Sequence, residues 1–467
     1  MTPSATGTAG EMHLSAFIQA SPNHQIKGMW KHPADETSWG YRTLRWWQDL
    51  VRTLERGCFD GIFFADVLGT YDVYGASREA GLRGAVQIPG IDPTLLIPAL
   101  AACTEHLGFA VTMSTSHHAP YHTARLFSTL DHLTGGRVGW NIVTSYLSDA
   151  ERQGLGEILP HDARYDRADE YVDVCLKLWE QSWEDGAVVL DAEADTFTDP
   201  AKVHEINHAG EWFTVEGPHM VEPSPQRTPV LYQAGNSARG VEFAANTGEV
   251  VFMSVPGNDR GAAVVASLRE RAAAAGRDPE QIRALQVARV VVAETDAEAR
   301  AMRDEWSRLF SVDGYLALYG GWTGIDLGGH PPDTPIDDIE ANAIRTQVER
   351  WKLEDPERIW TVGDVARRLS ETAGGLGFVG SPASVADQME AFIETTGVDG
   401  FNVTTAPVPW GFTQVVDLLV PELQRRGRFR SGYEGSTFRE NFFGAGQRHL
   451  HPTYPRPLGT PATTFHP

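Results

Sequence analysis

Residues 107–144 read LGFAVTMSTSHHAPYHTARLFSTLDHLTGGRVGWNIVT. Two apolar, β-branched runs, 107–114 and 138–144, are separated in this stretch by a segment of a different, helical character. The same alternation recurs along the chain, and it is typical of a parallel α/β protein. Eight alternations of this kind predict a (β/α)8 TIM barrel. The eight runs lie near residues 12–18, 61–65, 107–114, 138–144, 229–234, 249–253, 284–293 and 399–404.

The segments between these runs carry helix start and stop signals. Gly57 closes a helix that precedes the second run, and Asp92-Pro93 opens one before the third. Residues 166–183 repeat an apolar face at helical spacing, and Ser381-Pro382 begins a helix that leads to the last run. The order of strands and helices is therefore the order that a barrel requires.

The chain of 467 residues is expected to form a single barrel domain, residues 1–467, because we find no internal repeat and no low-complexity linker. Two connections are too long for simple barrel loops, at about 145–228 and about 294–398, and we expect insertions with elements of their own there. A C-terminal tail from about 428–467 has no clear periodicity. We expect this arm to wrap the barrel or a neighbouring subunit.

The composition excludes several classes of protein. The formal net charge is −23, which argues against binding to nucleic acid or to an anionic membrane surface. The three cysteines, Cys58, Cys103 and Cys175, are too few and too scattered for a disulfide framework or a cysteine zinc site. The sequence has no apolar run of eighteen residues, and its first residues lack a signal peptide pattern. We expect a soluble, cytoplasmic protein.

Polar residues follow four of the predicted strands. In a TIM barrel the active site forms at the C-terminal ends of the strands, so these residues should converge on one mouth. Any one of them could instead be a structural cap or a buried polar side chain, and about half would be if taken singly. The residues are Asp66, then Thr112 to His118, then Asn141, Thr144 and Ser145, and then Gln233 to Ser237.

Residues 234–240, AGNSARG, follow the fifth strand and begin a helix. Small residues let backbone N–H groups approach an anion, and a helix N-terminus favours negative charge. We predict a phosphate site at Gly235, Asn236 and Ser237, although the same pattern also forms ordinary turns and caps. The usual phosphate position in this fold follows strands seven and eight, so this site would be a departure.

Three further patterns are set aside. Residues 204–208 fit HExxH, but Pro200 and Gly210 flank them and the alternation is that of a strand, so a zinc peptidase is disfavoured. Residues 375–380 fit GxGxxG, yet they follow a helix-like segment, and we predict a loop there and no dinucleotide fold. His117, His118 and His122 are predicted to line a pocket and not to bind a metal.

Several long motifs resemble one enzyme group. Residues 128–145, 161–165 and 232–240 are similar to the nitrilotriacetate monooxygenase, pristinamycin synthase and dibenzothiophene-sulfone monooxygenase group of bacterial-luciferase-like flavin enzymes. The likeness covers nearly the whole chain. Within the group, residues 64–74 and 319–324 most resemble long-chain alkane monooxygenase.

The resemblance implies a two-component monooxygenase. Such an enzyme takes reduced FMN (FMNH2) from a separate NAD(P)H:flavin reductase and uses O2 to oxygenate a small-molecule substrate. A homo-oligomer, dimer or tetramer, is expected. Asn141 and Ser145 would lie beside the flavin, and Tyr165 and Ser237 would reach its phosphate. The positions that match flavin contacts are Asp66, Thr112, His161, Tyr165 and Ser237.

The resemblance also marks a substrate side. His24, Tyr71 and Gln87 match pocket residues of the alkane enzyme, and His24, Tyr71 and His117 are candidates for hydrogen bonds to the substrate or to the oxygen being transferred. Three pocket positions differ from that enzyme: Ser21, Tyr146 and Leu318. A tyrosine can stack on a ring and donate a hydrogen bond, so we expect a larger, partly polar or heteroaromatic substrate of riboflavin or sulfone type. Long-chain alkane hydroxylation and a deazaflavin-dependent dehydrogenase are the alternatives, with a zinc hydrolase and a non-catalytic flavin-binding protein behind them.

Overall fold

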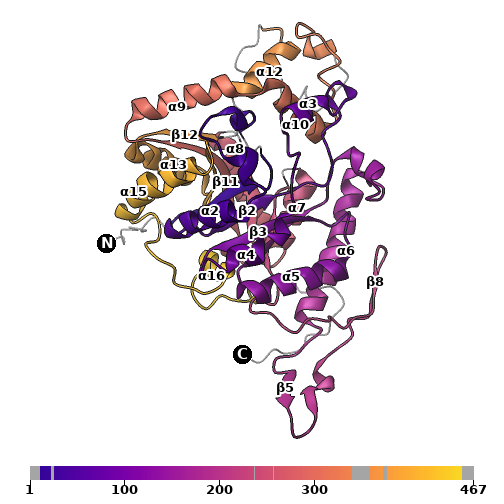
Figure 1. Cartoon of the computed structure of the whole chain (residues 1–467). Coiled ribbons are helices and arrows are strands. Elements are labelled where there is room, and N and C mark those ends of the chain that lie inside the picture. Colours follow the sequence, from indigo (N-terminus) through magenta and orange to yellow (C-terminus); the bar gives the residue numbers. More distant parts are fainter. Residues whose placement is uncertain are drawn as a thin grey trace, which may run out of the picture.

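The computed structural model describes residues 11–22, 26–235, 237–255, 257–338, 358–371 and 376–454. Eight parallel strands form a closed barrel, because β10 pairs with both β9 and β11 and β1 pairs with both β2 and β13 (Figure 1). Each of the eight predicted runs coincides with one of these strands, so the predicted TIM barrel is confirmed. The barrel strands are β1 (His13–Gln19), β2 (Gly61–Ala65), β3 (Gly108–Ser114), β4 (Val138–Val143), β9 (Val230–Gln233), β10 (Val250–Met253), β11 (Arg283–Val292) and β13 (Gly400–Thr404).

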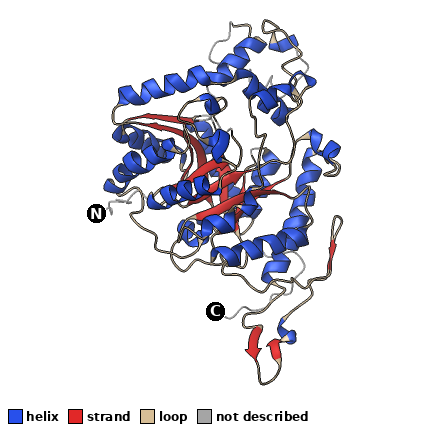
Figure 2. Cartoon of the chain, in the orientation of Figure 1, coloured by secondary structure: helices blue, strands red, loops and turns tan. Residues whose placement is uncertain are grey.

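Helices surround the sheet (Figure 2). Gly57 follows α2 directly, so this predicted stop signal is confirmed, and Gly397, with φ +72°, ends α13. None of the described helices is long and apolar enough to cross a membrane. The longer helices are α2 (Leu44–Arg56), α5 (Pro120–Thr134), α6 (His161–Glu180), α7 (Ala238–Thr247), α8 (Asn258–Ala274), α9 (Asp296–Leu309), α10 (Val312–Thr323), α12 (Val362–Glu371) and α13 (Pro382–Thr396). The shorter ones are η1 (Met29–Lys31), α1 (Thr37–Gly40), η2 (Tyr74–Ala76), α3 (Glu79–Arg83), η3 (Pro93–Leu95), α4 (Ile97–Ala101), η4 (Ser148–Gln153), η5 (Pro200–Lys202), η6 (Pro279–Gln281), η7 (Ile336–Asp338), α14 (Trp410–Gln414), η8 (Val415–Leu419), α15 (Val420–Arg425) and α16 (Phe438–Phe443).

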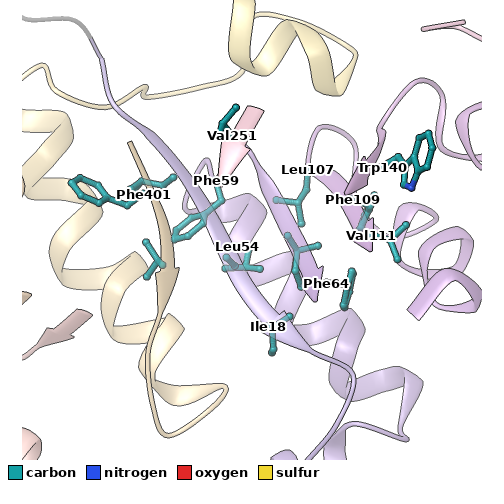
Figure 3. Close-up of a cluster of buried hydrophobic side chains, with 14 of the residues drawn as sticks. Ile18, Leu54, Phe59, Phe64, Leu107, Phe109, Val111, Trp140, Val251 and Phe401 are labelled. Carbon is teal, nitrogen blue, oxygen red and sulfur yellow. The ribbon is translucent and has the colours of Figure 1, made fainter. Parts of the chain in front are cut away.

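The largest core lies between the outer face of the sheet and these helices (Figure 3). Ile18, Phe64 and Val111 come from three neighbouring strands, and they share this core with Leu54 of α2. Each of them is almost completely buried. Alternate residues of the same strands point into the barrel instead, where Phe17 and Phe63 pack edge to face.

Helix α16 closes the N-terminal end of the barrel, where the strands begin. Phe438 is completely buried against the first residues of the strands, and a Cβ on Gly108 would lie 1.9 Å from its ring. Gly108 is therefore required for Phe438 to enter. Asn441 fixes the helix by donating to the carbonyl oxygens of Asp60 and His106 at 3.0 and 3.1 Å. Only the opposite, C-terminal rim is left for a ligand.

The prediction of a loop over 375–380 is wrong for residues 376–380. They form β12 (Leu376–Gly380), which pairs in parallel with residues 288–292 of β11. The pairing arises because β11 is long. Residues 283–286 of β11 pair with β10, and β11 extends beyond β10, so that residues 288–292 can pair with β12. Since Gly377 and Gly380 lie within the strand and not in the turn after it, the order required for a dinucleotide fingerprint is absent from the described segment.

Elements from the two long connections lie outside the barrel. The first supplies α6 and two hairpins, formed by β5 (Val188–Asp191) with β6 (Thr196–Thr198) and by β7 (His208–Ala209) with β8 (Thr214–Val215). The second supplies α9, α10, α12 and β12. Helix α10 packs on α3 and η2, which lie in the connection after β2 (Figure 1). The second connection thus reaches over the loops of the C-terminal rim.

Candidate active site

A cavity of about 590 Å³ opens at the C-terminal rim of the barrel. Its size is within the range of about 300–1,000 Å³ that is usual for ligand pockets. Residues that end or follow β2, β3, β4 and β9 form its walls, so the four polar strand ends do converge. The candidates that line it are Asp66, Gln87, Thr112, Ser145, Tyr146, His161, Tyr165 and Gly235.

Thr112 is held in a fixed orientation at the cavity wall. Its Oγ1 donates to the carbonyl oxygen of Phe64 at 3.0 Å and accepts from Nδ2 of Asn141 at 2.9 Å. Its only hydrogen is therefore used, and toward a ligand it can only accept a hydrogen bond. Asn141 is buried behind Thr112 and does not line the cavity. Its Oδ1 has no partner in the described part of the chain.

Asp66 places a carboxyl group on the same cavity. Burial raises its pKa to about 6, the nearby charge of Asp92 adds to this effect, and the backbone N–H of Val67 opposes it. Asp92 also lines the cavity, while its own carboxylate caps η3 by accepting from the N–H of Thr94. A carboxyl group with a pKa near 6 can exchange a proton close to neutral pH.

Two of the cavity residues have unusual backbone angles. Gln87 has φ +56° and Ser145 has φ +54°. Non-glycine residues in this region cost roughly 1–3 kcal/mol and persist only where the surrounding structure imposes them, often at functional sites. The Ser145 side chain is fixed as well, since its Oγ lies 2.6 Å from Oγ of Ser114. Strain is therefore stored at the cavity mouth.

The predicted phosphate site lies at the N-terminus of α7. Oγ of Ser237 accepts from the N–H of Gly240 at 3.0 Å, which leaves its own O–H hydrogen available to a ligand. Gly235 and Gly240 approach closely: a Cβ on Gly240 would lie 2.9 Å from Cα of Gly235 and 2.9 Å from Oη of Tyr165. The two glycines thus bring the Tyr165 hydroxyl to the first turn of α7, where free N–H groups can bind an anion.

Arg164 also lines this cavity, although the sequence reasoning did not select it. Its Nη1 donates to the carbonyl oxygen of Ser145, while its Nε is buried without a partner among the described residues. Burial lowers the pKa of this guanidinium, but it stays charged at neutral pH. We expected only neutral donors for an anion, and the structure adds a positive charge. Its place beside Tyr165 in the first turn of one helix was the available signal.

Arg239 is not available to a ligand in the same way. Its guanidinium pairs with Asp166 at 3.0 Å and with Asp169, and both carboxylates hold the pKa of Arg239 above its usual value. The group also lies 5.6 Å from the centre of the Tyr165 ring. Arg239 therefore joins α7 to α6 and fixes Tyr165.

Of the paired histidines, His118 lines the cavity and His117 does not. Nδ1 of His117 lies 3.0 Å from the carbonyl oxygen of Leu155, toward the loop that precedes α6. Burial lowers the pKa of both histidines. Neighbouring side chains on this loop point in different directions, so sequence position alone could not choose between them.

The substrate-side candidates form a chain of hydrogen bonds. Oη of Tyr71 donates to Oε1 of Gln87 at 2.7 Å and lies 2.9 Å from Oη of Tyr146. Trp322 of α10, which the sequence reasoning missed, donates from Nε1 to Oη of Tyr146 at 3.1 Å. Gln87 and Tyr146 line the cavity, whereas Tyr71 and Trp322 stand behind them. His24 and Asn236 lie outside the described residues.

The HExxH segment does not form a metal site. His204 pairs with Glu184 and His208 with Glu170, and neither lies in an α-helix. Within the described part of the chain, no group of three or more potential ligands is placed to hold a metal ion.

Comparisons with known proteins agree with this geometry. The family model described as luciferase-like monooxygenase matches residues 25–400. Dimethyl-sulfide monooxygenase of Hyphomicrobium sulfonivorans is 44% identical over 95% of this chain and 92% of its own. Long-chain alkane monooxygenase of Geobacillus thermodenitrificans is 44% identical over 94% of this chain and 96% of its own. A crystal structure of long-chain alkane monooxygenase matches with a TM-score of 0.88, covering 96% of this chain and 99% of that one. Riboflavin lyase, crystallised with modified FMN and riboflavin, is 33% identical with a TM-score of 0.87, covering 95% of this chain and 98% of that one.

Proposed function

Because this chain belongs to the luciferase-like monooxygenase family, we propose that its cavity binds reduced FMN beside a small organic substrate that receives one atom of O2. The protein is a flavin-dependent monooxygenase. The observation that carries the proposed site is the meeting of Asp66, Thr112, Tyr165 and the α7 N-terminus at one cavity.

The residues present fit FMN. Gly235 and Gly240 pack so closely that a side chain on either would clash, and this brings Oη of Tyr165 beside the free N–H groups of α7. Arg164, Tyr165 and Ser237 offer one positive charge and two hydroxyl donors to a phosphate. In a protein of net charge −23, such local donors are required to hold a dianion.

The ring end of the site has a different character. Thr112 would accept a hydrogen bond from a ring N–H, and Asn141 orients Thr112 from behind. Asp66 can hold a proton near the ring at a pH close to 6. When bound, reduced FMN supplies the electrons that activate O2.

The chain's own residues also exclude water. Tyr71, Val86, Leu147, Ala317 and Leu318 form a buried apolar cluster that joins α10 to the loops after β2 and β4. This cluster lies next to the cavity residues Gln87 and Tyr146 in sequence. The buried apolar side chains support the part of the cavity wall that Gln87 and Tyr146 form. By limiting the access of water, they would protect a reactive oxygen species from side reactions.

We also propose that a separate NAD(P)H:flavin reductase supplies the reduced FMN. The support is the placement of Gly377 and Gly380 within β12, which leaves the described residues without a dinucleotide fingerprint. The cytoplasmic location and the dimer or tetramer remain predictions.

For the substrate, we propose a partly polar or heteroaromatic molecule. Alkane hydroxylation is the second candidate, favoured by the 44% identity to long-chain alkane monooxygenase. The hydroxyl of Tyr146 and the amide of Gln87 disfavour it, because an alkane offers no partner for the hydrogen-bonding capacity that these groups retain at the cavity wall after their contacts with Tyr71.

The test is anaerobic titration of the protein with FMNH2, followed by addition of ¹⁸O2 and of alkane, sulfone or flavin substrates. We expect saturable FMNH2 binding and ¹⁸O in one product. Binding without substrate-dependent oxygen uptake would indicate a flavin-binding protein. Anaerobic hydride exchange with a deazaflavin, without oxygen chemistry, would indicate the dehydrogenase.

A further inference from the structure

The chain of hydrogen bonds behind the cavity has a fixed donor at one end. The indole N–H of Trp322 can only donate, and it is directed at Oη of Tyr146 at 3.1 Å. Tyr146 in turn contacts Tyr71, and Tyr71 contacts Gln87. Each hydroxyl in the chain has a single hydrogen, so the direction of one bond determines the next.

With Oε1 of Gln87 facing Tyr71, the hydrogens run from Trp322 to Tyr146, to Tyr71 and to Gln87. The hydroxyl hydrogen of Tyr146 is then used on Tyr71, and Tyr146 can only accept from a ligand. The amide nitrogen of Gln87 is left to donate. The cavity wall therefore presents one acceptor and one donor.

Reversal of the Gln87 amide exchanges these roles but keeps the pair. Gln87 then donates to Tyr71, and Tyr71 donates to Tyr146, whose own hydrogen is free to donate to a ligand. The carbonyl oxygen of Gln87 becomes the acceptor. In both arrangements one of the two groups, Gln87 or Tyr146, can donate a hydrogen bond to a ligand and the other can accept one. Both groups contact the hydroxyl oxygen of Tyr71.

Apolar contacts fix Tyr71, the central member of this chain of hydrogen bonds. Val86 and Leu147, the sequence neighbours of Gln87 and Tyr146, pack with Tyr71 and with Leu318 of α10 in one buried cluster. Gly321 of the same helix lies so close that a Cβ there would be 2.3 Å from the Tyr71 ring. The Tyr71 hydroxyl is therefore a fixed partner for Gln87 and Tyr146, which both contact it.

We propose that Gln87 and Tyr146 together recognise a cyclic cis-amide, a ring in which N–H lies directly beside C=O, and that Trp322 positions Tyr146 for this role. Such a lactam edge offers one donor and one acceptor, and this is the complement of the pair in both arrangements. The inference rests on the proposed function, because it assigns the substrate class of that monooxygenase. It predicts lactam-bearing heteroaromatic substrates over alkanes and thioethers.

The test uses three bicyclic probes that differ at this edge: 2-quinolone, N-methyl-2-quinolone, which lacks the N–H, and quinoline, which lacks the lactam. Each probe is titrated calorimetrically into the full chain saturated with FMN, so that the flavin's own ring edge cannot cause a difference between the probes. We expect 2-quinolone to bind at least about tenfold more tightly than its N-methyl derivative, as the loss of one buried hydrogen bond predicts.

Substitutions test which residues cause the preference for 2-quinolone over its N-methyl derivative. Tyr146→Phe and Gln87→Leu should abolish the preference, and Trp322→Phe should reduce it while leaving the affinity for quinoline unchanged. The matched control is Trp410→Phe, since Trp410 is 40% exposed, is comparable with Trp322 at 48%, and lies outside the cavity wall. It should keep the full preference.

Equal affinities of the wild type for the two quinolones would overturn the inference, as would a preference that persists in Tyr146→Phe. If FMN binds and none of the probes does, the lactam class is wrong and the proposed function stands. If FMN itself does not bind, both fail.

Discussion

The phosphate assignment can be tested by a charge at the N-terminus of α7. Ser237→Asp keeps the cap, because aspartate accepts the N–H of Gly240 as well as serine does. The fold should therefore survive. The new carboxylate, however, would occupy the turn at which the free N–H groups of α7 converge, and a bound phosphate would have to share that turn.

The expected loss of FMN affinity follows from the distance between the two negative charges. A carboxylate in hydrogen-bond range of Gly240 lies within about 4 Å of an anion on the same helix turn, where one pair of unit charges repels by about 4 kcal/mol at an effective dielectric constant of 20. Water at the open mouth screens part of this, and Arg164 offsets a further part. We expect FMN affinity to fall by about 100-fold or more, which is about 2.7 kcal/mol.

The assay compares FMN with riboflavin, which lacks the phosphate, by anaerobic titration of both in reduced form. Ser237→Asn is the matched control, since asparagine caps equally well and carries no charge. Riboflavin affinity should not change, and added salt should restore part of the FMN affinity. If Ser237→Asp leaves FMN binding intact, or weakens FMN and riboflavin equally, the phosphate does not lie at α7.

Three further predictions concern stability. The pKa of Asp66 is raised to about 6, so the folded state holds a proton that the unfolded state releases near pH 4; stability therefore falls as pH rises from about 4 to 6 and stays lower above that. Asp66→Asn should remove this slope and add up to about 3 kcal/mol to the free energy of unfolding at pH 7, measured by urea denaturation across pH; an unchanged slope would contradict it. Thr112→Val removes the partner of Asn141 and should cost about 1–3 kcal/mol. The control Thr413→Val in α14 should cost little, because Oγ1 of Thr413 makes a long hydrogen bond of 3.5 Å to the carbonyl oxygen of Pro409. Phe438→Ala opens a cavity at the barrel bottom and should cost about 3–5 kcal/mol by the same assay; a loss under 1 kcal/mol would show that α16 does not close the barrel.

Local sequence patterns were sufficient for the barrel itself. Each strand is buried on both faces and reads as a short apolar run, and glycine or proline marks the helix ends, as Gly57 and Asp92-Pro93 show. These signals depend only on neighbouring residues. The rule that sites form at strand ends then placed Asp66, Thr112 and Ser145 at one mouth, and the structure brings them together.

Tertiary contacts decided the rest. The sequence 376–380 reads as a glycine-rich loop, and it is a strand only because the far half of β11 offers it a partner. Arg164 faces the cavity because the orientation of α6 about its axis turns this residue toward it. Trp322 contacts Tyr146 although the two residues are 176 positions apart in the sequence.

By itself, the sequence determined the strand order, the end of the barrel that carries the cavity, and the glycine-containing turn and helix cap after β9, since periodicity, caps and small residues act over one or two turns of chain. Only the tertiary structure decided which side chains face the cavity and which donors are already used, because hydrogen-bond direction depends on partners that the closed barrel and α10 bring from distant segments. The donor and acceptor at Tyr146 and Gln87 are therefore properties of the folded wall, and neither residue carries them alone.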